Sequence, residues 1–229
     1  LTALGIEGVT DANLPAIQAA IAATADDGSD VSTVADLQNV VTAMVDVLAT
    51  AAGEPADLSV EDLGLLGVTV TPEQLAAVTA AIAATNVDGT EVDTPAELLE
   101  VVTDAIAALD NALTEISAYD GTGDAPLVQD YTDAGVSGIT DTNVAAMNSI
   151  IAPFLSGATD ETAELQVIAD ALNNVIAGAA GTAAEAAPTI TDLEALGFTN
   201  VDADNITAIQ AVIAAGGVEG VEDLTEIQA

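Results

Sequence analysis

The chain has 229 residues, 51% of them hydrophobic, and a formal net charge of −38 from 38 acidic residues and no Lys, Arg or His; it also has no Cys. These absences exclude the usual zinc, copper, haem and iron–sulfur sites, cysteine nucleophiles, Ser-His-Asp triads, Schiff-base lysines and phosphate-clamping arginines. We therefore expect no enzymatic activity and, because an all-negative surface repels nucleic acid and anionic lipid, neither nucleic-acid binding nor membrane insertion.

The charge also indicates where the protein works. A chain that carries only carboxylates repels itself unless counterions are abundant, and sea water or a calcium-containing exterior supplies them. The high apolar content distinguishes the chain from a disordered acidic tail, and the 2% of aromatic residues predicts small aliphatic cores. We therefore expect an extracellular or bacterial cell-surface protein.

A short first helix is predicted at the start of each of four repeats. A glycine recurs at intervals of roughly 60 to 70 residues, which is typical of a repeat array. These glycines are Gly5, Gly67, Gly135 and Gly197, and four residues before them lie Leu1, Leu63, Tyr131 and Leu193. That spacing suits an amphipathic helix that ends at a C-terminal glycine.

A second helix is predicted next. Its cap position is occupied by Thr10, Thr71, Thr140 and Asp202, and three residues later stand Asn13, Gln74, Asn143 and Asn205. In Thr71-Pro72-Glu73-Gln74 the Thr caps, the Pro takes the first helical position and the Gln reaches back. Apolar residues then recur at spacings of three and four, which places them on one face of a helix. They are Leu14, Ile17 and Ile21; Leu75, Val78 and Ile82; Val144, Met147 and Ile151; and Ile206, Ile209 and Ile213.

A third, longer helix is predicted after a loop. Thr33-Val34-Ala35-Asp36 and Thr94-Pro95-Ala96-Glu97 have the composition of capping boxes that open it. Met44 lies on its apolar face and Met147 on that of a second helix, so both are predicted core residues. Tyr131 replaces a repeated Leu and is predicted to lie in the core as well.

Together these elements predict an all-α fold, a tandem array of small three-helix bundles. The predicted modules span residues 1–52 (first helix truncated), 60–118, 128–181 and 190–229 (third helix truncated), with linkers rich in Gly, Pro and acids between them. The linkers are short enough to bring a long third helix near the first helix of the next module, so neighbouring repeats are expected partners. Every long apolar stretch is broken before about 18 residues and no signal peptide is recognised, so we expect no transmembrane helix. Because the first and fourth modules are truncated, we expect the chain to be a segment of a longer protein.

Calcium is the one cofactor that the sequence suggests, because oxygen-rich loops suit a hard cation. The candidate ligands are Asp26, Asp27, Asp30, Asp88, Asp120 and Asp124. The spacing departs from an EF-hand, because placing Gly89 at loop position six puts Ala84 and Pro95 where acids are required. In the alternative interpretation Gly28 and Gly89 close the second helix, the following Asp and Thr residues cap the third, and cations condense diffusely on the surface. No catalytic residue and no other cofactor-binding residue is predicted.

The fourth repeat reads LEALGFTNVDADNITAIQAVIAAGGVEGVEDLTEIQ. It resembles the GA-like three-helix modules of bacterial surface proteins. Over nearly the whole chain, the repeats look still more like the acidic repeats of giant secreted adhesins (RTX-type and biofilm-associated) of Gram-negative, often marine, bacteria. The resemblance implies a three-helix fold and a role at the cell surface. It does not imply the albumin binding of some GA modules, since the basic and aromatic surface residues expected in such an interface are missing.

Two functions are compatible with this pattern. The first is a structural spacer or stalk in a surface adhesin or biofilm-matrix fibre. The alternative is a self-associating or ligand-binding module that assembles identical chains into a filament or surface layer, with divalent cations bridging the acidic faces.

Overall fold

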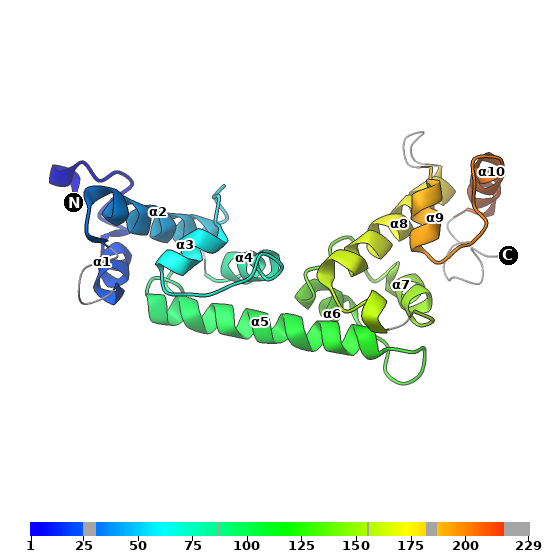
Figure 1. Cartoon of the computed structure of the whole chain (residues 1–229), viewed down its shortest axis with the longest axis horizontal. Coiled ribbons are helices and arrows are strands. Elements are labelled where there is room, and N and C mark those ends of the chain that lie inside the picture. Colours follow the sequence, from blue (N-terminus) through cyan, green and yellow to red (C-terminus); the bar gives the residue numbers. More distant parts are fainter. Residues whose placement is uncertain (25–30, 87, 155, 182–186, 218–229) are drawn as a thin grey trace. The chain divides into compact units, whose positions relative to one another are not determined.

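The computed structural model describes residues 1–24, 31–86, 88–154, 156–181 and 187–217. Across these ranges every regular element is a helix, which confirms the predicted all-α class (Figure 1). The α-helices are α1 (Leu14–Ala23), α2 (Val34–Ala51), α3 (Val60–Leu65), α4 (Leu75–Ala83), α5 (Pro95–Ala118), α6 (Val128–Asp133), α7 (Val144–Ile151), α8 (Thr162–Ala180), α9 (Ile190–Ala195) and α10 (Ile206–Gly216). Two short 3-10 helices, η1 (Thr2–Leu4) and η3 (Ser156–Ala158), lie among them.

The glycine turn after the first helix has the same geometry in every copy. Gly5, Gly67, Gly135 and Gly197 all have φ between 74° and 85°, a left-handed conformation that glycine adopts most readily. The next amide donates to a carbonyl five residues earlier, from Val68 to Leu63 at 2.9 Å, from Val136 to Tyr131 at 2.8 Å and from Phe198 to Leu193 at 3.0 Å. This bond is the mark of a Schellman ending, and it confirms the predicted glycine-closed helix.

A side chain three residues after the cap holds the turn that leads into the second helix. Its oxygen accepts a hydrogen bond from the amide of the cap residue. The bonds run from Thr10 to Asn13 at 2.7 Å, Thr71 to Gln74 at 3.0 Å, Thr140 to Asn143 at 2.7 Å and Asp202 to Asn205 at 2.9 Å. The predicted reach-back is therefore confirmed, but the predicted helix start is wrong. Because this bond folds the three residues after the cap into a turn, the helices begin only at Leu14, Leu75, Val144 and Ile206.

Capping-box residues open α2 and α5 as predicted, whereas Glu161, the cap residue of α8, forms no side-chain cap hydrogen bond. The Thr33 amide donates to Asp36 Oδ2 at 2.9 Å and the Asp36 amide donates to Thr33 Oγ1 at 3.1 Å, at the start of α2. At the start of α5, the Glu97 amide donates to Thr94 Oγ1 at 3.3 Å, and that hydroxyl donates to Glu97 Oε2 at 2.7 Å. Further boxes, which were not predicted, open α3 with Ser59 and Asp62 and open α9 with Thr189 and Asp192.

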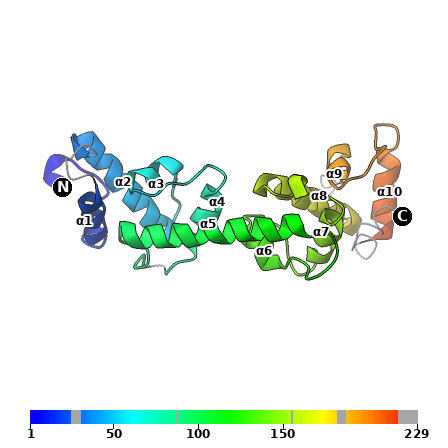
Figure 2. The ribbon, with the colours of Figure 1, turned by 60° about the horizontal axis from the view of Figure 1, so that its bottom comes forward.

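The chain divides into two compact units, Leu1–Leu109 (unit 1) and Asp110–Ala229 (unit 2), with the boundary inside α5. In unit 1, α2 packs against α1, α3 and α4 (Figure 2). The core there includes Ile6, Ile17, Val40, Met44, Leu63, Val78, Ile82 and Leu98. The long helix of the first copy therefore shares its core with α3, the first helix of the second copy, as the short linker predicts. It also packs against α4, which was not predicted. The division into four modules stays a prediction.

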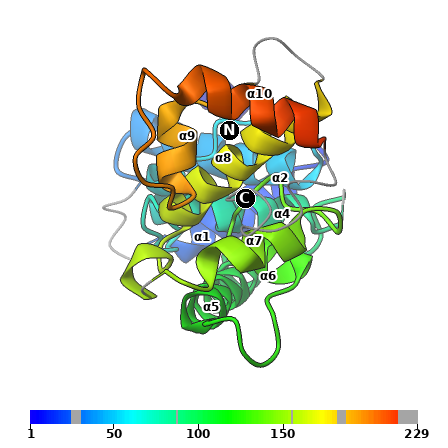
Figure 3. The ribbon, with the colours of Figure 1, turned by 90° about the vertical axis from the view of Figure 1, so that its right-hand side faces the viewer.

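Unit 2 repeats this arrangement around α8, which packs against α7, α9 and α10 (Figure 3). Its core includes Ile116, Tyr131, Met147, Ile151, Leu165, Leu172, Leu193 and Ile213. Tyr131 is fully buried, and its hydroxyl donates to Asn148 Oδ1 at 2.6 Å, while Asn148 Nδ2 donates to the Pro126 carbonyl at 2.8 Å. Tyr131, Met147 and Met44 are core residues, as predicted.

One helix of the described part, α2, is long and apolar enough to cross a membrane by length and composition alone. The predicted interruptions are present in α2, where Asp36, Asn39 and Asp46 stand among the apolar residues, and the absence of a transmembrane helix stays a prediction. A helix in the core of a soluble bundle meets the same criteria. Val40, Val41 and Met44 of α2 are buried within unit 1, whereas Val34 at the start of the helix is 52% exposed.

Candidate functional site

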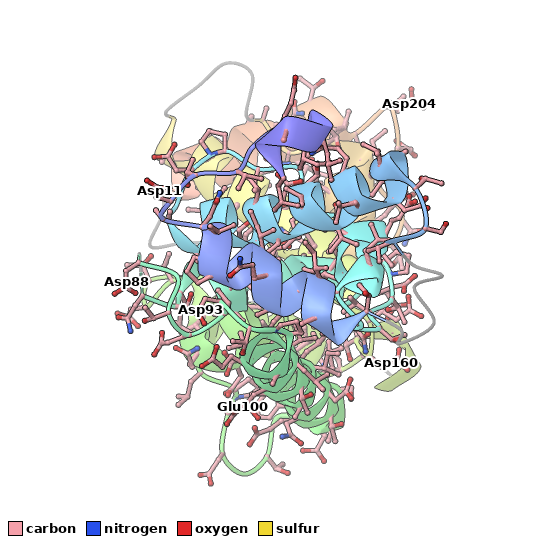
Figure 4. All side chains as sticks on the ribbon, turned by 90° about the vertical axis from the view of Figure 1, so that its left-hand side faces the viewer. Asp11, Asp88, Asp93, Glu100, Asp160 and Asp204 are labelled. Atoms are coloured by element: carbon pink, nitrogen blue, oxygen red, sulfur yellow. The ribbon has the colours of Figure 1, made fainter. Side chains whose placement is uncertain are left out.

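The predicted calcium ligands fall into two groups. Asp26, Asp27 and Asp30 lie outside the described residues. Asp88 lies in the loop between α4 and α5, where it is exposed (Figure 4). Asp120 and Asp124 are exposed in the segment between α5 and α6. The hydrogen bonds of Asp88 and Asp120 indicate what their carboxylates do.

Asp88 shapes its own loop. Its Oδ1 accepts hydrogen bonds from the amide of Thr90 at 3.2 Å and from the Thr90 hydroxyl at 2.9 Å, the pattern of an Asx turn. Nearby, Glu91 Oε2 accepts from the Asn86 amide at 2.9 Å. Gly89 bends this loop with φ +69° and does not close the second helix as the alternative interpretation has it. The helix α4 already ends at Ala83. The Ala84 amide donates to the Ala80 carbonyl at 3.0 Å, and the Thr85 amide donates only three residues back, to Ile82, at 3.1 Å.

Asp120 forms the same kind of turn. Its Oδ1 accepts from the Thr122 amide at 3.0 Å and from the Thr122 hydroxyl at 2.6 Å. These bonds, the hydroxyl first, lower the pKa of Asp120. Within the described residues, acidic side chains form no group of three or more placed to hold a metal ion. Calcium binding by Asp88, Asp120 and Asp124 stays a prediction, while turn formation by Asp88 and Asp120 is observed.

Two depressions in unit 1 were not predicted from the sequence. One, of about 560 Å³, is lined by Ala20, Ala23, Thr24, Asp36, Asn39, Glu61 and residues 64–67. The other, of about 430 Å³, is lined by Ala81, Ala84, Thr85, Thr90, Glu91, Glu97, Glu100, Val101 and Asp104. Both lie where the end of a second helix meets the start of a long third helix. The signal in the sequence is the pair of alanines at matching positions of α1 and α4, since small side chains leave space there.

The second depression is the more acidic, and its carboxylates are already engaged in part. Glu97 accepts from the Thr94 hydroxyl, which is the main reason that the pKa of Glu97 is lowered. Burial, followed by contact with Glu97 and the charge of Asp88, raises the pKa of the neighbouring Asp93. The chain has no His, Lys or Cys to pair with these acids as nucleophile or base. The arrangement attracts cations and supplies no other evident chemistry.

Some carboxylates elsewhere hold helix starts. Thr33 and then Ser32 donate to Asp36 and lower its pKa. On the same helix, burial and then the charges of Asp62 and Asp57 raise the pKa of Asp46. Comparison with protein-family models, curated proteins and solved structures finds no match for this chain.

Proposed function

We propose that the chain is a non-enzymatic structural repeat region, a tandem array of three-helix bundles that acts as a spacer or stalk in a large extracellular bacterial adhesin or biofilm-matrix fibre. The observation that carries the proposal is that polar side chains hydrogen-bond to the backbone at turns and helix starts. Asn13, Asn143 and Asn205 hold equivalent turns, and Asp36 and Asp192 hold helix starts. Polar groups that would otherwise be available for chemistry serve the backbone instead.

The sharing of cores between copies supports a mechanical role. In unit 1 the long helix α2 packs against elements of its own copy and of the next, and α8 does the same in unit 2. In repeat proteins such contacts between neighbours contribute much of the stability. The charge of −38 supports an extracellular location, because abundant counterions there screen the repulsion between carboxylates.

The alternative is self-association into a filament or surface layer. The observation that favours it is a set of large apolar side chains that stay exposed in unit 2. Leu127 is 67% exposed, Val167 is 55% exposed and Val212 is 68% exposed. Identical chains that cover these side chains would need cations between their acidic surfaces.

Sedimentation of the purified chain separates the two functions. We expect a spacer to sediment as a monomer both with millimolar calcium and with a chelator at matched ionic strength. Magnesium at the same concentration is the control for general screening of charge. Larger species that form with calcium and disperse on chelation would contradict the spacer and support the assembling module.

A further inference from the structure

The copies share one backbone pattern, so a residue in one copy can be compared with its equivalent in another. In unit 2, Asn174 of α8 donates Nδ2 to Asp192 Oδ1 of α9 at 3.1 Å. Asp192 also closes the capping box of α9. In unit 1, Asp46 of α2 is the equivalent of Asn174, because each lies equally far from the cap residue of its helix. Asp62 is the equivalent of Asp192, because it closes the capping box of α3. A neutral donor in one unit is thus a carboxyl group in the other.

The same replacement occurs at the start of the long helices. Ser32, which directly precedes the cap residue of α2, donates Oγ to Asp36 Oδ2 at 2.9 Å. In the second copy Asp93 directly precedes the cap residue of α5, and Glu97 stands at the position of Asp36. Side-chain contact with Glu97 contributes to the raised pKa of Asp93, and two ionised carboxylates have no proton with which to form a hydrogen bond.

Both carboxyl groups face other acids and no cation. Asp46 is half-buried and faces Asp62 and Asp57, while α1 and α4, which also pack against α2, carry no charged residue. Asp93 is half-buried and faces Glu97. The loop before it adds the charge of Asp88, and α4 carries no charged residue. Ionisation at either position therefore places like charges together.

We propose that Asp46 and Asp93 are proton-dependent latches of unit 1. When protonated, Asp46 donates a hydrogen bond to Asp62 and Asp93 donates one to Glu97, in place of the bonds that Asn174 and Ser32 make. When ionised, each repels its neighbour. As the solution becomes acidic, the contact between α2 and α3 therefore becomes more stable. The start of α5 is stabilised in the same way. The equivalent contact of α8 with α9 is held by an amide and lacks this response.

The sign of the effect follows from linkage. The folded pKa of Asp46 lies above its ordinary value of 3.8, so the folded chain holds this proton more tightly than the unfolded chain does. The stability that the proton adds is complete below 3.8 and is lost as the pH rises through the folded pKa. Asp93 has a pKa shift of the same direction.

Thermal unfolding of four variants and the wild type, each at pH 7 and near pH 4, tests the latches. We expect Asp46→Asn to raise Tm at pH 7 by about 2 to 4 °C, since an amide donates without a proton, and to lose this advantage near pH 4. Asp93→Ser, which introduces the residue type of Ser32, should do the same. Asn174→Asp should lower Tm at pH 7 and recover near pH 4. The control is Asp11→Asn, which removes the same charge from an exposed side chain of unit 1 (Figure 4).

Two results would overturn the latches. One is a Tm change for Asp46→Asn that is the same at both pH values or equals that of Asp11→Asn, since it would report packing or net charge alone. The other comes from carbon-detected NMR titration of the Asp46 and Asp93 carboxyl groups in the wild-type chain. We expect both to titrate above 3.8, and titration of both at or below that value would remove the proposal.

Discussion

At the scale of single residues, the repeat is defined by backbone positions that few side chains tolerate. Gly8, Gly138 and Asn200 occupy the same position and have φ of 79°, 83° and 63°. An Asn five residues later donates to each of their carbonyls at 2.7 to 2.8 Å. Asn is the non-glycine residue that enters this left-handed region most easily, which explains why it replaces glycine in the fourth copy.

Substitution of Gly138 by Ala is expected to destabilise unit 2 by about 1 to 3 kcal/mol, because Ala is strained at positive φ. The added Cβ would also meet Asn173 Nδ2 at 2.6 Å, a group that donates to the Gly138 carbonyl. Urea unfolding measures the change. The control is Gly64→Ala, because Gly64 lies in α3 with open space around it and a helical Ala is favoured by about 0.5 kcal/mol. Equal effects of the two substitutions would contradict this expectation.

At the scale of elements, the long helices connect one copy to the next. Leu63 of α3 is fully buried and belongs to the same core as Met44 of α2 and Ile17 of α1. A change in the second copy is therefore expected to weaken the first.

Leu63→Ala should cost about 2 to 5 kcal/mol in urea unfolding, because it leaves a cavity in that shared core. Amide hydrogen exchange should quicken in α2 as well as in α3. The matched control is Leu4→Ala, since Leu4 is 58% exposed in the same unit. Faster exchange confined to α3, with α2 unchanged, would show that the copies fold separately.

Short sequence patterns predicted the turns, capping boxes and apolar helix faces, and little of the structure beyond these. The Gly67 turn, the Thr33–Asp36 box and the helical face of Leu75, Val78 and Ile82 follow from residues close in sequence, so they were predictable. The late start of α4 was not, because the Gln74 amide donates to the Thr71 carbonyl at 3.1 Å and closes a turn before the helix begins.

The site was harder to predict than the helices. Composition drew attention to Asp88 and Asp120, whose carboxylates hold turns. The less conspicuous Asp46 acquires its raised pKa from burial and from Asp62, which belongs to the next copy. Such a pairing depends on tertiary contacts, and a single sequence does not display these.

At the scale of the whole molecule, three properties occur together. The copies repeat one set of turns, and neighbouring copies share cores. Where an ionisable side chain holds one of these turns, that side chain is an acid. A spacer requires the first two, and an ion-rich exterior accommodates the third. In a spacer of this kind, adding copies adds length.

The most direct test is small-angle X-ray scattering from this chain and from a tandem dimer of residues 1–229 expressed as one polypeptide, in the same buffer. A compact domain that doubles its residue number increases its radius of gyration only about 1.3-fold. We predict for the spacer an increase that approaches two-fold, with monomeric samples confirmed by forward scattering. An increase of about 1.3-fold would contradict the claim that these repeats serve to extend the protein.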